Sequence, residues 1–183
     1  EDQAAAALER TFGEGRGREM FRRFITPESR SGLYRESTTP EQVPADGVAK
    51  SFDDASGITA SHEPDKAFDG KADTHWASNV PKPTVPKDVG MEWDRPVDVS
   101  GIEIDFTVPQ HSPTPDGLKI QMWNGSDWQS VDANAKRRDL ASWVVTFPTV
   151  TTRRIRVLIT KTISDGGKPR HPAITELRLY RKS

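Results

Sequence analysis

Apolar residues recur at every second position in at least six short runs of the sequence. The runs are 89–93, 102–106, 118–122, 143–147, 155–159 and 177–179. Successive side chains of an extended chain point to opposite faces, so a period of two places the apolar side chains on one face. The pattern therefore predicts β-strands with one buried face each, and it limits the chain to folds built from such strands.

Turn-forming residues separate these runs. Asn124-Gly125 stands between Trp123 and Trp128 and is a strong hairpin signal. Further turns are predicted at 94–96, 115–117 and 165–167. No helical segment lies between the strands, which argues against a parallel α/β sheet. Antiparallel strands at this spacing predict a two-sheet sandwich or a barrel.

Composition narrows the function classes. The chain has 183 residues, of which 29% are charged, and its net charge of −1 argues against a nucleic-acid binder driven by bulk charge. It has no cysteine, which excludes disulfides and thiolate metal ligands. No apolar run approaches the length of a membrane span, and we find no signal peptide. Because Glu1 is not a natural start, we expect a processed or excised piece of a larger protein.

The first 50 residues differ from the rest. Residues 1–24 predict a helix, on account of an alanine-rich stretch and scattered apolar residues, although three glycines interrupt it. Residues 26–50 are polar and contain three prolines, as in a linker or a strap lying on another surface. The helix could equally be the tail of a preceding domain. We therefore predict a helical segment and linker at 1–50, packing on a neighbouring domain, and a β domain at 51–183.

Residues 66–76 have the composition of a cation-binding turn. Asp69-Gly70 follows two apolar residues, and the glycine permits the positive φ of a sharp bend. Asp69, Asp73 and Thr74 then bring side-chain oxygens together, as a hard cation such as calcium requires. A plain polar turn is the alternative interpretation of this stretch alone.

Residues 51–183 resemble the discoidin domain, also called the coagulation-factor type C domain, whose bacterial members are the family 32 carbohydrate-binding modules. The matching segments follow the order of the family and are 66–70 with Thr74 and Trp76, 89–93, 99–104, 118–123 with 128–131, 153–157, and 174–180. They cover roughly three quarters of the chain. The resemblance implies an all-β fold, a two-sheet antiparallel jelly-roll sandwich of the galactose-binding-like type.

The resemblance also implies a structural calcium ion between the first and last motifs. Carried over by position, its ligands would be the carboxylates of Asp69 and Glu176, a Thr74 oxygen, and the backbone carbonyls of Lys66, Lys71 and Thr175. A carboxylate at Glu176, next to core positions of a strand, is costly unless it is paired or binds a cation. A water-facing glutamate is the alternative. The ion would clip the last strand to the first loop and would not be catalytic.

The ligand site of the family lies on loops at one end of the sandwich. Three loops supply polar candidates here, namely Asn79 on the first, Gln110 and His111 on the second, and Arg170 and His171 on the third. Such groups can reach the hydroxyls of a sugar stacked on an aromatic ring. The sugar-binding members usually carry an Arg and an Asn on the second loop. This sequence has neither there, which speaks against a preference for galactose.

The remaining polar and aromatic residues favour structural roles. Trp76, Trp93 and Trp143 are predicted in the core, and Trp123 and Trp128 pair across the hairpin. Acidic residues such as Glu103 and Asp105 share a water-facing side of a strand. They are therefore not expected to act as the two catalytic carboxylates of a glycosidase. We interpret the arginines at 153, 154 and 156 as part of a solvated face of a strand. The histidines at 62, 75, 111 and 171 are scattered in sequence without a metal-binding or catalytic spacing.

These features predict a non-catalytic carbohydrate-binding module that targets a larger, secreted glycan-active enzyme to its substrate. Its partners would be a glycan or polysaccharide and the catalytic domain of the same parent protein. Two alternatives stay open: an accessory domain that only stabilises such an enzyme, and an adhesion domain that binds protein or phospholipid.

Overall fold

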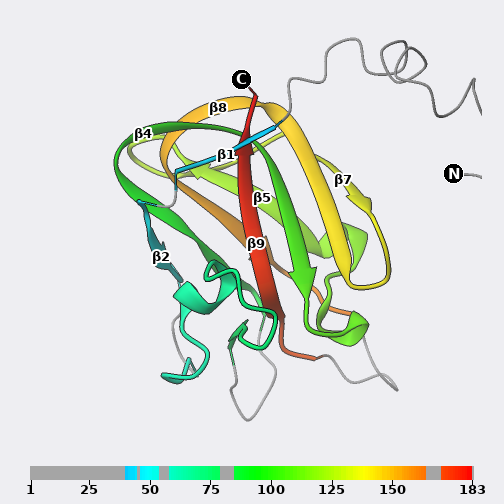
Figure 1. The fold of residues 1–183 in the computed structure, drawn as a ribbon. Helices are drawn as coiled ribbons and strands as arrows, with labels where there is room; N and C mark the ends of the chain where they lie inside the picture. Colours follow the sequence, from blue (N-terminus) through cyan, green and yellow to red (C-terminus); the bar gives the residue numbers. More distant parts are fainter. Residues whose placement is uncertain (1–39, 45, 54–57, 79–84, 164–169, 183) are drawn as a thin grey trace, which may run out of the picture. The chain divides into compact units, whose positions relative to one another are not determined.

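The computed structural model describes residues 40–44, 46–53, 58–78, 85–163 and 170–182, which fold into antiparallel strands (Figure 1). The strands are β1 (Glu41–Gln42), β2 (Val48–Lys50), β3 (Trp76–Ala77), β4 (Lys87–Phe106), β5 (Leu118–Trp123), β6 (Trp128–Ser130), β7 (Asn134–Arg137), β8 (Ser142–Ile159) and β9 (Ala173–Arg181). Short 3-10 turns lie between them at η1 (Pro64–Ala67), η2 (Pro109–His111) and η3 (Pro115–Gly117). The predicted all-β class is confirmed.

The long strands β4 and β8 turn one hydrogen-bonded sheet into two layers. The first part of β4 pairs with β2 and with the last part of β8, whereas residues 101–106 pair with β9 and with the first part of β8. Register shifts after Glu92 and after Val99 let the pair bend between the layers. One layer holds β2, β5 and β6 and the other holds β1, β3, β7 and β9, so the predicted sandwich is confirmed.

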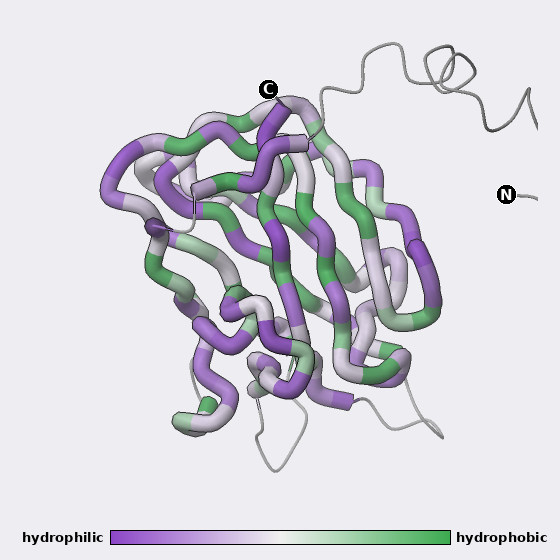
Figure 2. The backbone as a smooth tube through the Cα atoms, in the orientation of Figure 1, coloured by the Kyte–Doolittle hydropathy of each residue, from purple (hydrophilic) through white to green (hydrophobic). Residues whose placement is uncertain are grey.

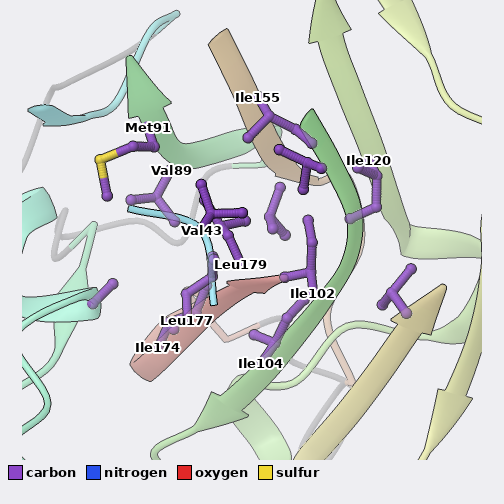
Figure 3. Close-up of a cluster of buried hydrophobic side chains, with 14 of the residues drawn as sticks. Val43, Val89, Met91, Ile102, Ile104, Ile120, Ile155, Ile174, Leu177 and Leu179 are labelled. Carbon is purple, nitrogen blue, oxygen red and sulfur yellow. The ribbon is translucent and has the colours of Figure 1, made fainter. Parts of the chain in front are cut away.

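The core lies between the layers and follows the alternation in the sequence. Hydrophobic and hydrophilic residues alternate along the strands in Figure 2. Figure 3 shows side chains from β4, β5, β8 and β9 converging, and its labelled members are Val43, Val89, Met91, Ile102, Ile104, Ile120, Ile155, Ile174, Leu177 and Leu179. Burial of each such side chain contributes about 1.5–3 kcal/mol. Trp76, Trp93 and Trp143 are buried as predicted.

Residues 41–50 belong to the sandwich, which corrects the boundary predicted after residue 50. β1 pairs with β9 and β2 pairs with β4. Between them, the Val43 N–H donates to the Leu179 carbonyl at 2.9 Å and Val43 is buried in the core. The prolines of this segment suggested a linker, but its backbone pairs with β9 and β4, and Val43 enters the core. The compact unit begins at Pro40, and the helix predicted at 1–24 lies outside the described residues.

The hairpin between β5 and β6 is confirmed. Trp123 and Trp128 are cross-strand partners with ring centroids 5.6 Å apart, and Gly125 has a positive φ of 107°. The Asn124 side-chain oxygen accepts the N–H groups of Ser126 and Asp127, which closes the turn. In the described part of the chain, no helix is long and apolar enough to cross a membrane.

Candidate functional site: a loop rim and an acidic turn

Loops from distant parts of the sequence meet at the end of the sandwich where β4 finishes and β9 begins (Figure 1). We call this end the rim and define it as residues 58–62, 75, 107–113 and 170–172. The Thr107 N–H donates to the Ala173 carbonyl at 3.2 Å, and the Ala77 N–H donates to the His62 carbonyl at 3.4 Å. These bonds fix the loops to the start of β9 and to β3.

The second rim loop is held from below by the core. Pro109 starts η2, where a fixed φ suits the first position of a helical turn. Ser112 at its end is fully buried, and its hydroxyl accepts the Trp143 indole N–H at 2.8 Å. The exposed Gln110 and the half-buried His111 therefore stand on a rigid support.

The third loop is tied to the second. The Ile163 N–H donates to the Ser112 carbonyl at 3.0 Å, and the Thr162 hydroxyl donates to the Arg170 carbonyl at 2.6 Å. His171 consequently lies against His111, with ring centroids 4.9 Å apart. The structure thus brings together three predicted ligand residues, His111, Arg170 and His171. Asn79 lies outside the described residues.

The sequence analysis missed two rim residues, His62 and His75. Their ring centroids are 4.5 Å apart, and the His62 ring is within hydrogen-bond distance of the Thr59 and Ser61 hydroxyls. All four histidines of the chain therefore gather at one end, although they are scattered in the sequence. Residue spacing could not show this, because the short strand β3 that carries His75 to β9 gave no alternating pattern.

The rim holds the imidazoles of His75, His111 and His171 neutral. Burial lowers the pKa of His111 to about 4, helped by the neighbouring His171, Arg170 and His75. Burial likewise lowers the pKa of His75, with contributions from His62 and His171. Burial also lowers the pKa of His171, and the positive charge of Arg170 lowers it further. At neutral pH, these three rings are therefore uncharged and can both donate and accept hydrogen bonds.

The predicted metal turn folds around one carboxylate. Gly70 has a φ of 71°, as the Asp-Gly pair predicted. Asp69 Oδ1 accepts the Lys71 N–H at 3.1 Å and the Thr74 hydroxyl at 2.8 Å. Although burial works to raise the pKa of Asp69, these two donors outweigh it and the pKa is lowered. The carboxylate is therefore ionised and held in place.

Glu176 comes to this turn from the far end of the chain. Asp105 pairs with Glu176 but Phe106 pairs with Ile174, so Thr175 is an extra residue in β9. This bulge lets Ile174 and Leu177 both enter the core while Glu176 points to the opposite side. Asp69 and Glu176 line one cavity of about 260 Å³, together with apolar residues such as Met91, Leu177 and Leu179.

Carboxylate, hydroxyl and carbonyl oxygens of the kind that calcium binds are present at this turn. Burial raises the pKa of Glu176, and the charges of Asp69 and Asp105 raise it further, although Arg178 and the Gly70 N–H act against them. An acidic group that neighbouring acids disfavour is stabilised by a hard cation. Among the described residues no three His, Asp or Glu side chains form a metal-binding group, so these two carboxylates would be completed by Thr74 and by the carbonyls of Lys66, Lys71 and Thr175.

The outer face of the β4–β8–β5 layer carries a second polar cluster, which we call the sheet-face cluster; its members are Phe52, Asp88, Trp123, Trp128, Arg154 and Arg156. Arg156 is only 5% exposed, so its assignment to a solvated face was wrong. Its guanidinium lies 4.1 Å from the Trp128 ring centroid and 2.6 Å from Asp53. Arg154 binds Glu92 at 2.7 Å and lies over Trp123. Ion pairs and stacking keep these cations in fixed positions.

The water-facing acids of β4 are also paired. Asp105 binds Arg178 at 2.6 Å and Arg138 at 2.9 Å, and Glu103 binds Arg178 at 3.2 Å. These side chains are about a quarter exposed, so the prediction that they face water is only partly right. Salt bridges across strands hold them, which does not suit a pair of catalytic carboxylates that must flank a substrate.

A jelly-roll sandwich with its polar loops gathered at one end belongs to the class of galactose-binding-like domains. The sequence profile of the F5/8 type C domain matches residues 49–176, more than half of the chain. The protein therefore belongs to the F5/8 type C, or discoidin, family. A search of curated protein sequences finds no match.

Solved structures of low sequence identity share the fold. The family 32 module of C. perfringens NanJ, in complex with galactose, aligns with a TM-score of 0.61 and 17% identity over 78% of this chain and 99% of that one. Chitosan-binding module 2 of a Paenibacillus sp. IK-5 chitosanase/glucanase, in complex with chitotriose, aligns with a TM-score of 0.58 and 23% identity. The alignment covers 74% of this chain and 97% of that one. CpGH89CBM32-5 from Clostridium perfringens, in complex with GalNAc-β-1,3-galactose, aligns with a TM-score of 0.58 and 12% identity. The alignment covers 74% of this chain and 96% of that one.

Proposed function

We propose that this domain is a non-catalytic carbohydrate-binding module whose ligand site is the rim. The observation that carries the proposal is the meeting of His111, His171 and Arg170, from loops that are far apart in the sequence, on supports anchored to the core. Family membership and the sugar complexes of the structural neighbours support it. No residue is assigned a catalytic role.

The rim offers the groups that a sugar requires. Gln110 and Arg170 are exposed and can donate to hydroxyl oxygens, and a neutral imidazole can accept a hydroxyl proton. The described loops contain no Trp, Tyr or Phe side chain on the rim, so the neutral His111–His171 ring pair would supply the flat surface. Galactose is not favoured, because the second loop lacks the Arg and Asn that galactose binders of this family carry.

We assign calcium a structural role at the acidic turn. The ion would supply positive charge to Asp69 and Glu176, thereby joining β9 to the loop after η1. Both segments also support the rim, since His75 follows the turn directly and His171 precedes β9. Calcium would therefore stiffen the rim without contacting the sugar.

The module would act by targeting. A tethered binding site raises the effective concentration of a catalytic partner at its substrate even when the single-site affinity is weak. We therefore propose a secreted, glycan-active enzyme as the parent protein, with residues 1–39 as the connection.

Titration with a glycan panel tests the rim. We expect saturable binding to at least one neutral or acidic oligosaccharide, weakened at least about tenfold by His111→Ala, which corresponds to about 1.4 kcal/mol. Trp128→Phe, on the sheet-face cluster, is the matched control and should bind normally. Loss of binding in the control alone would move the site to the sheet face.

A second candidate function is that of an accessory domain without a ligand. The lack of an exposed aromatic ring in the described rim loops favours it, because sugar sites generally use one. In that case no glycan of the panel would bind, and removal of the domain would lower the melting temperature of the adjoining enzyme.

A further inference from the structure

The four rim histidines form two ring pairs that adjoin each other. His111 lies against His171 at 4.9 Å and His62 lies against His75 at 4.5 Å, measured between ring centroids. They come from four separate segments of the chain, at η2, before β9, before η1 and before β3. Each pair thus depends on the fold rather than on local sequence.

The chemistry of the His111–His171 pair suits a borderline divalent metal. Imidazole binds such ions through the lone pair of an unprotonated ring nitrogen, and the two rings lie in contact with each other. The His111 Nδ1 atom lies 2.6 Å from the Thr107 hydroxyl. If Nδ1–H donates to this hydroxyl, the Nε2 lone pair of His111 is left for a metal, as in sites where an outer group orients the ligand.

The spacing of the two rings is also suitable. A tetrahedral zinc ion bound to two imidazole nitrogens at about 2.0–2.1 Å sets the ring centres about 5 Å apart. The observed separation of 4.9 Å between ring centroids, with the ring planes 33° apart, is compatible with this arrangement. Since no three His, Asp or Glu side chains of the described residues form a metal-binding group, water or a ligand atom would complete the coordination.

We propose that His111 and His171 form a binding site for a borderline transition-metal ion, with zinc as the representative. The nitrogen ligands separate this site from the oxygen-lined acidic turn, which would select calcium. The proposal goes beyond glycan binding and does not depend on it, because no sugar group is needed to hold the ion.

Calorimetric titration of the full chain with zinc chloride at pH 7.5, in the presence of saturating calcium, tests the site. We expect one equivalent of zinc with a Kd below about 100 μM. His111→Gln and His171→Gln should each weaken binding by about 10- to 100-fold, and Thr107→Val should weaken it less. His62→Gln, in the other ring pair, is the matched control and should change the affinity less than about twofold.

Proton NMR of the histidine rings supplies a second readout that does not require a stable titration baseline. Zinc should shift the resonances of His111 and His171 first. The absence of zinc binding, or equal weakening by His62→Gln, would overturn the proposal. Melting curves of the metal-free variants establish that each one is folded.

Discussion

The rim and the sheet-face cluster contain similar kinds of groups in opposite circumstances. On the sheet face, Arg154 and Arg156 are each fixed by a carboxylate and by a tryptophan ring. On the rim, the described pKa shifts of His111 and His171 arise from burial and from other positive or imidazole groups, and no carboxylate contributes. The sheet-face groups satisfy one another through ion pairs, whereas His111 and His171 are neutral rings that lie against each other.

Both regions are rich in polar side chains, but this difference indicates a structural role for the sheet-face cluster and a binding role for the rim. A buried charge that has its partners contributes to holding the strands together, and its loss is costly. A neutral ring pair on anchored loops contributes little to folding and is suited to recognition. Mutations should therefore act on stability at the sheet face and on binding at the rim.

The largest effect is expected for Asp88→Ala. Asp88 is 1% exposed, accepts the N–H groups of Phe52 and Asp53, and lies 3.5 Å from Arg156. Its removal leaves a buried cation without its buried partner and should lower the free energy of unfolding by about 3–5 kcal/mol. Asp53→Ala should cost less than about 1 kcal/mol in the same urea titration, although Asp53 lies closer to Arg156, because its side chain is 54% exposed. Equal losses in both variants would contradict this account.

Calcium should produce the next largest effect. An excess of about 100 times the Kd stabilises the folded state by about 2.7 kcal/mol, which corresponds to about 5–10 °C in the melting temperature of a domain this size. Glu176→Gln should abolish this rise. Because the pKa of Glu176 is raised by burial and by neighbouring acids, the calcium-free variant should be at least as stable as the calcium-free wild type at pH 7. A calcium-dependent rise that survives in Glu176→Gln would exclude this site.

The pH dependence of stability provides a smaller test of the rim. The pKa of His111 falls from 6.5 to about 4 on folding, so between these values the unfolded state binds more protons. Because folded His111 resists protonation, the protein keeps its full stability above about pH 6.5 and loses stability as the pH falls toward about 4. After allowance for solvent screening, we expect this loss in the free energy of unfolding to be about 1–2 kcal/mol. The difference between wild type and His111→Gln, followed by urea unfolding from pH 7 to pH 4, isolates this amount, and a constant difference would contradict it.

The smallest effect is expected for Arg181→Ala. Arg181 binds Glu41 at 2.6 Å and so joins β1 to β9, but both side chains are more than a third exposed. Exposed pairs contribute about 0–1 kcal/mol and are screened by salt. A melting curve should shift by no more than about 4 °C and the shift should shrink at high salt. A larger, salt-independent loss would show that β1 is held by this pair rather than by Val43.

The sequence predicted the parts of the fold that depend on local pattern. Alternation located the long strands, and Asn124-Gly125 and Asp69-Gly70 located sharp turns. The edge strands at 41–42 and 48–50 escaped prediction because two or three residues carry no period and their role is to pair with distant strands. The burial of Arg156 could not be predicted for a related reason, because it depends on Asp88 and Trp128, which lie on other strands.

For the candidate site, the sequence suggested individual residues but not all of those that meet in the fold. Asp69 and Glu176 line one cavity, as the family resemblance implied, and His111 meets His171. The inclusion of His62 and His75 could not be inferred, because it requires the path of the chain before β3. Direct pairing in space, rather than spacing in sequence, defines the rim.

The most direct test of the central claim compares glycan affinity with stability in two double variants. In His111→Ala/His171→Ala, the account predicts at least about a tenfold loss of affinity for the best oligosaccharide of the panel, with a change in melting temperature below about 4 °C. In Trp123→Phe/Trp128→Phe, it predicts a clear loss of stability with unchanged affinity. Unchanged affinity in the histidine double variant, together with lost binding in the tryptophan one, would contradict it.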